Sequence, residues 1–81
     1  MKTEKIKEVI ENILLELHDD LDYRKEQRLV DDKLFDSFDL VTLVAELGME
    51  LSIDVTAEDF VPENFNSLEA LTAMAERLME G

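Results

Sequence analysis

Residues 36–51 read DSFDLVTLVAELGMEL. Asp36 is a good helix N-cap, and Asp39 follows three residues later, a spacing typical of a helix start. The apolar residues then recur every three or four positions, as they do along one side of a helix: Leu40, Leu43, Val44, Leu47 and Leu51. The stretch therefore predicts a helix over residues 37–51. Gly48 lies inside it, at a cost of about 0.5–1 kcal/mol relative to alanine.

The part of the chain before this stretch contains the strongest helical pattern. Residues 3–17 predict a helix with Thr3 as its N-cap, because six apolar residues share one side: Ile6, Val9, Ile10, Ile13, Leu14 and Leu17. Over residues 18–35 the period is lost and polar side chains dominate. We predict a long ordered loop there, with room for a short helical turn, pinned to the core by its apolar residues: Leu21, Tyr23, Leu29, Leu34 and Phe35.

The part after it predicts a connector and a last helix. Ile53 and Val55 form an extended pair that points inward. Thr56 is expected to cap a short helix over residues 57–61, which Pro62 would end. Asn66 is expected to cap the last helix, with Glu69 completing a capping box. The apolar residues of that helix are Leu68, Leu71, Ala75 and Leu78, supported by Met74 and Met79.

These segments predict an all-α fold. We expect an antiparallel bundle of three main helices plus one short helix, with a long loop between the first and second helices. A chain of 81 residues has room for one domain, over residues 1–81. Two glycines and one proline are too few for the many tight turns of a sandwich or barrel.

The charge is strongly acidic. Eight basic and 21 acidic residues give a net charge of −13. Nucleic-acid binders need the opposite sign to neutralise phosphates, and anionic membrane surfaces are disfavoured for the same reason. The expected partners are proteins with basic patches. The same charge opposes self-association, so we expect a monomer.

Cysteine is absent, which excludes disulfides, thiolate metal sites and a cysteine nucleophile. No apolar run approaches the roughly 18 residues of a membrane-spanning helix, and residues 1–10 lack the continuous apolar stretch of a signal peptide. We therefore expect a cytoplasmic protein without stable membrane insertion.

The sequence offers little for catalysis. His18 is the only histidine, and we interpret it as a solvated side chain of the polar loop, without the oriented partner that general-base work needs. The carboxylates are spread along helix faces rather than gathered in a cleft. Residues 19–32 lack the sixth-position glycine of an EF-hand. We expect no enzyme and no specific metal site, although an acidic helical protein that binds metal ions stays an alternative.

The pair Asp36-Ser37 stands at the junction of the long loop and the second predicted helix. Serine is common at helix starts for purely structural reasons. An exposed hydroxyl there is also well placed to carry a phosphate, because free N–H groups and the positive end of the helix dipole favour an anion.

Residues 34–44, LFDSFDLVTLV, resemble the phosphopantetheine-attachment motif of acyl carrier proteins. In that family an Asp-Ser-Leu triplet opens the second helix. Here Asp36 and Ser37 match it, Phe38 replaces the leucine, and Asp39 matches the acidic residue that follows. Residues 51–55, LSIDV, are similar to the family's aromatic-Gly-Ile-acid-Ile segment, and the resemblance covers essentially the whole chain.

The resemblance implies a carrier that is not itself an enzyme. Ser37 would bear a covalent 4′-phosphopantetheine, and Asp36 would position the metal and coenzyme of a phosphopantetheinyl transferase. Phe38 would contact partner enzymes. The acidic face of the second helix would be read by basic patches on a loading ligase and on downstream synthases or transferases; its residues, at seven and four residues apart, share one side: Asp39, Glu46 and Glu50.

The cargo stays open. A fatty acyl chain, as in fatty acid biosynthesis, D-alanine or a specialised intermediate would each fit a carrier. Residues 59–67, DFVPENFNS, are similar to the loop of D-alanyl carrier proteins of Gram-positive cell-wall teichoic acid modification. A further alternative is an acidic interaction module that works unmodified. The candidates for lining an acyl cleft are also candidates for plain core: Leu43, Leu47, Ile53, Phe60 and Leu68.

Overall fold

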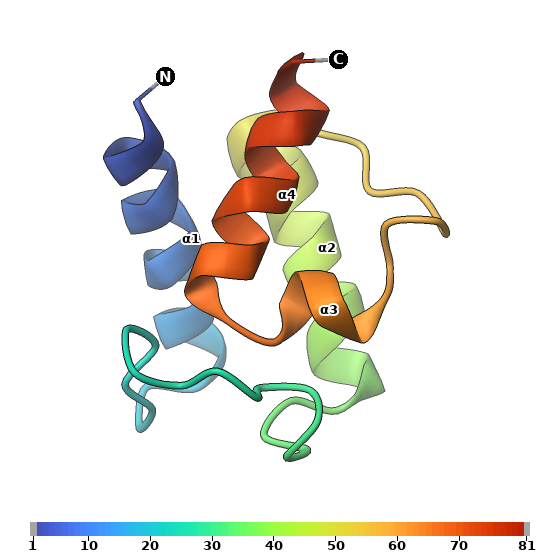
Figure 1. Ribbon diagram of the computed structural model, residues 1–81. Coiled ribbons are helices and arrows are strands. Elements are labelled where there is room, and N and C mark those ends of the chain that lie inside the picture. Colours follow the sequence, from blue (N-terminus) through green and yellow to red (C-terminus); the bar gives the residue numbers. More distant parts are fainter. Residues whose placement is uncertain (1, 81) are drawn as a thin grey trace.

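The computed structural model describes residues 2–80, which form four helices and no strand. The helices are α1 (Thr3–Leu17), α2 (Ser37–Leu51), α3 (Pro62–Phe65) and α4 (Leu68–Glu80) (Figure 1). The all-α class is confirmed, and α1 and α2 have the bounds that the apolar periodicity predicted. None of these helices combines the length and the apolar character needed to cross a membrane.

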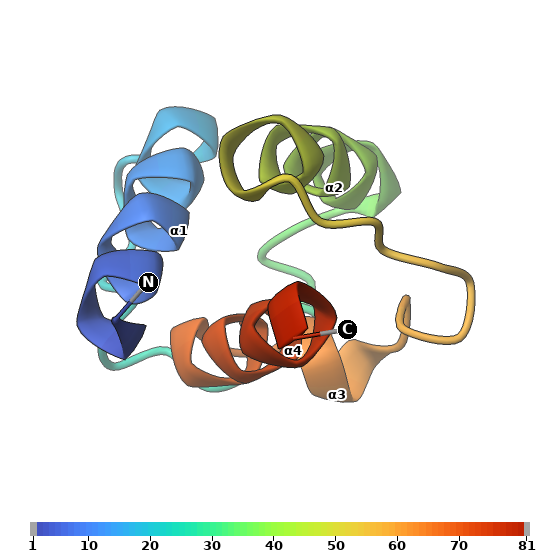
Figure 2. The same ribbon diagram turned by 90° about the horizontal axis from the view of Figure 1, so that it is seen from above.

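The helix α1 lies between α2 and α4 and packs against both, while the short α3 packs against α4. The chain runs along α1 in the direction opposite to that of α2 and α4 (Figure 1). Seen from above, the three long helices surround a common interior, and the segment before α3 closes the remaining side (Figure 2). Side chains from all three fill that interior with almost no exposed area: Ile10, Leu14, Leu43, Leu47, Leu68 and Leu71.

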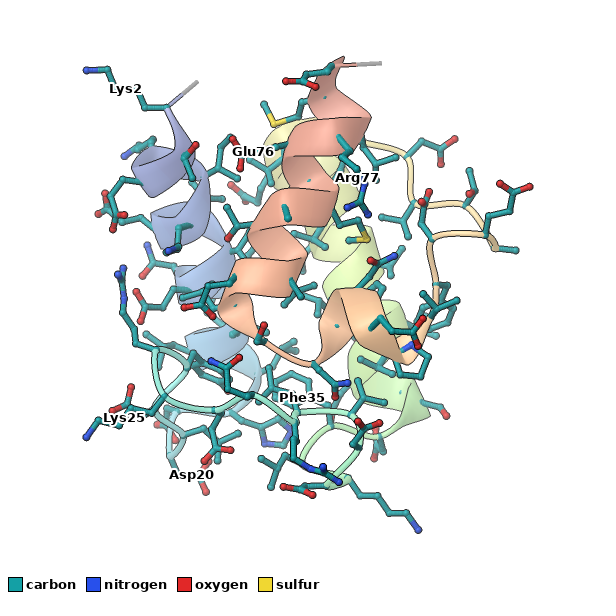
Figure 3. The ribbon with its side chains drawn as sticks, in the orientation of Figure 1. Lys2, Asp20, Lys25, Phe35, Glu76 and Arg77 are labelled. Carbon is teal, nitrogen blue, oxygen red and sulfur yellow. The ribbon has the colours of Figure 1, made fainter. Side chains whose placement is uncertain are left out.

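The long loop between α1 and α2 is ordered by contacts to the helices, as predicted. Tyr23, Leu29 and Phe35 are buried in the core, and Phe35 lies beneath the helices while Asp20 points away from them (Figure 3). The Tyr23 hydroxyl lies 2.5 Å from the carbonyl of His18 and 3.1 Å from that of Leu14, and it shares its one proton between them. Burial raises the pKa of Tyr23 to about 12, so this hydroxyl stays a donor.

The prediction that Asn66 caps the last helix is wrong. Ser67 precedes α4, and its hydroxyl accepts a hydrogen bond from the N–H of Ala70 at 3.0 Å. The Asn66 side chain reaches back to the long loop instead, where its Oδ1 accepts from the N–H groups of Val30 and Asp31, both at 3.0 Å. The backbone carbonyl of Asn66 also accepts from the N–H of Leu29 at 2.9 Å. Asn66 therefore joins the loop to the junction of α3 and α4.

The predicted helix over residues 57–61 is also wrong. That segment is a turn, in which the Thr56 hydroxyl donates to Asp59 Oδ2 at 3.0 Å. Pro62 begins α3 rather than ending a helix, because the first helical position needs no N–H donor and suits the fixed φ of proline. Val61 before it is extended, as a residue preceding proline prefers.

Thr3 is the first residue of α1 and not its N-cap, which is Lys2. The Thr3 hydroxyl donates to Glu76 Oε2 at 2.7 Å, so it joins the start of α1 to α4. The Glu76 side chain lies on the part of α4 that faces α1 (Figure 3). The capping rule considered only α1, whereas the Thr3 hydroxyl bonds to Glu76 in α4.

Candidate functional site

The first turn of α2 is closed by a capping box. Asp36 is the N-cap, and its Oδ1 accepts from the N–H of Asp39 at 2.8 Å. In return Asp39 Oδ2 accepts from the N–H of Asp36 at 3.3 Å. The N-cap predicted at Asp36 is confirmed. Ser37 lies between the two aspartates, so the backbone on both of its sides is fixed.

Ser37 differs from the two other serines of the chain. It is exposed at the first position of α2, and its hydroxyl has no hydrogen-bond partner within residues 2–80. Ser67 is buried and its hydroxyl is used as a cap. Ser52 is exposed but ends α2 in a left-handed conformation, with φ of 55°, at the negative end of the helix dipole. Among the three, Ser37 alone presents an unengaged hydroxyl at a positive helix end.

An apolar strip covers the outer side of α2. Phe38 is 78% exposed, Val41 61% and Met49 74%, and Ala45 lies exposed between them. We call these four residues the outer strip. Phe38, Ala45 and Met49 lie at seven and four residues apart, so they share one side of the helix. Exposed apolar groups gathered on one helix side are a common feature of protein contact surfaces.

The predicted acidic residues of α2 follow another side of the helix. Asp39 and Glu46 are half-buried, and Glu50 is exposed. Glu46 and Glu50 line a hollow between α1 and α2 together with Asn12 and Glu16. The acidic side of α2 therefore faces α1 and lies next to the outer strip. That partner proteins bind to this acidic side stays a prediction.

The interpretation of His18 as a solvated side chain without an oriented partner is wrong in its second part: the side chain is 36% exposed, but it has a partner in Asp39. Its Nε2 lies 2.8 Å from Asp39 Oδ2, and its ring meets the Phe35 ring edge-on at a centroid distance of 4.9 Å. The hydrogen bond to Asp39 raises the pKa of His18, and the bond to His18 lowers the pKa of Asp39. One feature could have indicated this contact. His18 directly follows α1 and Asp39 lies in the first turn of α2, so a loop that returns to the helices brings the two residues together.

Two apolar hollows lie beside α2. The first, of about 140 Å³, is lined by Val41, Val44 and residues 55–57, and the second, of about 180 Å³, by Leu40, Val30 and the start of α3. Phe60 lines both and separates them, with its ring 5.3 Å from that of Phe65. Of the proposed cleft residues, only Phe60 lines a hollow, since the others are buried in the core: Leu43, Leu47, Ile53 and Leu68.

Within residues 2–80, no three histidine, aspartate or glutamate side chains converge in a way that would hold a metal ion. Comparisons of the chain with models of known protein families, with curated proteins and with solved structures found no match. The function therefore has to be inferred from the residues themselves.

Proposed function

We propose that this chain is a free-standing carrier protein that bears 4′-phosphopantetheine on Ser37. The observation that carries the proposal is the free, exposed hydroxyl of Ser37 at a capped helix start, inside a sequence similar to the attachment motif of acyl carrier proteins. In this interpretation residues 1–81 are one carrier domain, and the helices form the antiparallel bundle that the sequence predicted. The chain positions cargo and leaves the chemistry to its partners.

The first turn of α2 suits a phosphodiester. The N–H groups of Ser37 and Phe38 have no hydrogen-bond partner within the described part of the chain, and they lie at the positive end of the helix dipole. The carboxylate of Asp36 would repel the phosphodiester, and the free N–H groups and helix dipole of the first turn would offset that repulsion. Asp36 remains exposed, as its expected role toward the transferase requires.

The attachment is a phosphoryl transfer from coenzyme A. The Oγ of Ser37 attacks the phosphorus that bears the pantetheine arm, and the new Oγ–P bond forms as a P–O bond of the diphosphate breaks. The hydroxyl proton passes to a base of the transferase, and adenosine 3′,5′-bisphosphate leaves. Once bound, the group supplies the thiol that holds cargo as a thioester, which is why the chain itself needs no cysteine.

The partner surface follows from the two sides of α2. The outer strip supplies apolar contact area beside Ser37, where Phe38 is 78% exposed. The neighbouring acidic side carries Asp39, Glu46 and Glu50, which attract basic patches on the transferase, the loading ligase and the downstream enzymes. Charge of this kind speeds encounter more than it tightens binding, so these partnerships should weaken with salt.

The hollows beside α2 favour a small cargo. Their volumes of about 140 and 180 Å³ are each below the roughly 300 Å³ at which small-molecule pockets usually begin. Phe60 keeps them separate. An aminoacyl or short acyl group needs no shelter of greater size. This observation supports the alternative of a D-alanyl carrier for teichoic acid modification over a carrier of long fatty acyl chains.

The exposed outer strip supports a second alternative, an interaction module that acts without modification. The two readings differ at Ser37: a carrier loses all function with Ser37→Ala, whereas a module keeps its partners. In either interpretation we propose a cytoplasmic protein. We also propose a monomer, because a net charge of −13 on 81 residues opposes self-association.

The test of the proposal is loading. The chain is incubated with coenzyme A and a broad-specificity phosphopantetheinyl transferase, and then with D-alanine or fatty acids and their ligases. Covalent uptake at Ser37 supports the carrier. Preferential thioester formation with D-alanine supports the small-cargo alternative, and preferential loading of long acyl chains contradicts it.

A further inference from the structure

Three contacts hold His18 at the end of α1, although its side chain stays 36% exposed. Its N–H donates to the carbonyl of Leu14 at 2.9 Å, and its own carbonyl accepts from the Tyr23 hydroxyl at 2.5 Å. The imidazole meets the ring of Phe35 edge-on. Because backbone and ring are both fixed, the direction in which Nε2 points is fixed as well.

From Nε2 a chain of hydrogen bonds leads through Asp39 to Asp36, the residue before Ser37. His18 Nε2 lies 2.8 Å from Asp39 Oδ2, and the same oxygen accepts from the N–H of Asp36 at 3.3 Å. Asp36 in turn caps the N–H of Asp39. The contact therefore fixes the Asp39 carboxylate, and through it the backbone on the N-terminal side of Ser37.

The hydrogen bond from His18 restricts the Asp39 side chain, which the capping box alone leaves free to change rotamer. Helix ends fray, and a single carboxylate on the surface holds its rotamer only weakly. An imidazole held at the end of α1 reduces that freedom, because Asp39 Oδ2 then accepts from two donors, His18 Nε2 and the N–H of Asp36. The side chain of Asp39 is only 20% exposed, and both of these hydrogen bonds fall on its Oδ2, as a positioning role requires; its charge still adds to the acidic side of α2.

We propose that His18 is a positioning residue for the modification of Ser37, which holds the first turn of α2 in the geometry that the transferase recognises. The proposal rests on the proposed function of Ser37. His18 touches neither Ser37 nor coenzyme A in this role, and it transfers no proton. Its effect is to raise the fraction of chains whose helix start is formed when the transferase arrives.

Two variants of His18 test the proposal. His18→Ala removes the donor, whereas His18→Gln keeps an N–H that can reach Asp39 but loses the imidazole. Arg28→Gln is the matched control, because it removes an exposed ion pair of the same loop with Asp32, at 3.0 Å. Each variant is followed by amide hydrogen exchange at Asp39 and Leu40 and by transferase kinetics with coenzyme A.

We expect His18→Ala to speed exchange of both amides by about tenfold and to raise the KM of the transferase for the carrier by a similar factor, with kcat unchanged. His18→Gln should restore most of both values, and Arg28→Gln should alter neither. Unchanged exchange and KM in His18→Ala would overturn the proposal. A loss of kcat with unchanged KM would also overturn it, since that would assign His18 a part in the chemistry.

The two proposals fail differently. If the wild-type chain takes up no phosphopantetheine, the proposed function fails, and with it the role of His18 in modification. Amide exchange still reports whether His18 fixes the helix start, because it needs no transferase. If the wild type is modified and His18→Ala is modified with the same KM, only the role of His18 fails.

Discussion

The Nε2 of His18 lies 2.8 Å from Oδ2 of Asp39, so one hydrogen bond joins the end of α1 to the first turn of α2. The negative groups that act on His18 are Asp39, then Asp20 and Asp36, and together they raise its pKa above the usual 6.5. The same contact lowers the pKa of Asp39 below 3.8. Both shifts mean that the pair stabilises the fold when both partners are charged.

The pair makes stability depend on pH. The stability that comes from the raised pKa of His18 is fully present below pH 6.5 and is lost as the pH rises through the folded-state pKa of His18. The stability that comes from the lowered pKa of Asp39 is present above pH 3.8 and is lost as the pH falls through the folded-state pKa of Asp39. The free energy of unfolding of the wild type should therefore exceed that of His18→Ala most at about pH 5–6, and progressively less as the pH rises through the folded-state pKa of His18. Urea unfolding of both chains checks this, and a difference that grows as the pH rises above about 6.5 would contradict it.

The capping box predicts a cost for Asp36→Ala. The N–H of Asp39 loses its acceptor at 2.8 Å, and a lost N-cap typically costs about 1 kcal/mol of unfolding free energy. Urea unfolding measures it. Asp54→Ala is the matched control, since Asp54 is exposed in the connector and has no hydrogen bond within residues 2–80; it should stay within about 0.5 kcal/mol of the wild type. Equal losses in both variants would show that the cap contributes nothing.

Asn66→Ala should destabilise the chain more than an ordinary surface change. The substitution leaves the N–H groups of Val30 and Asp31 without their acceptor, and a hydrogen bond typically contributes about 0.5–1.5 kcal/mol to the free energy of unfolding. Asn12→Ala removes an amide that has no hydrogen-bond partner in the described part of the chain and serves as control. Thermal unfolding of the two variants separates them. Similar midpoints would mean that Asn66 does not hold the loop.

The two partly exposed phenylalanines should respond differently to alanine. Phe38 is 78% exposed, so Phe38→Ala should change the free energy of unfolding by less than about 0.5 kcal/mol. Phe60 is 43% exposed and meets Phe65 edge-on, so Phe60→Ala should cost about 1–2 kcal/mol. Phe60→Ala also joins the two hollows beside α2, which should increase the fluorescence of an apolar dye. Identical behaviour of the two variants would contradict the role of Phe60 between the two hollows.

Local patterns predicted α1 and α2 with their bounds because each depends on its own apolar stripe and, for α2, on a capping box three residues long. The long loop could be predicted to be ordered because Tyr23, Leu29 and Phe35 were too apolar to stay in water. Two of the errors fell where a residue could serve either of two local rules. Pro62 can end one helix or begin the next, and Asn66 and Ser67 are both good N-caps.

The candidate site was predictable only in part. Asp36, Ser37 and Phe38 are neighbours in sequence, so their place at the start of α2 followed from the helix itself. The contact between His18 and Asp39 spans 21 positions, and its geometry depends on how the whole loop returns to α2. The lining of the two hollows depends on the path of residues 55–61, which no periodic pattern describes.

The most direct measurement is the intact mass of the chain after incubation with coenzyme A and a broad-specificity phosphopantetheinyl transferase. Ser37→Ala and Ser52→Gly are measured beside the wild type; the second removes an exposed serine at a left-handed position that glycine tolerates. The carrier account predicts a gain of one phosphopantetheine in the wild type and in Ser52→Gly, and none in Ser37→Ala. A folded wild type that gains no mass, or a Ser37→Ala chain that still gains it, would contradict the account.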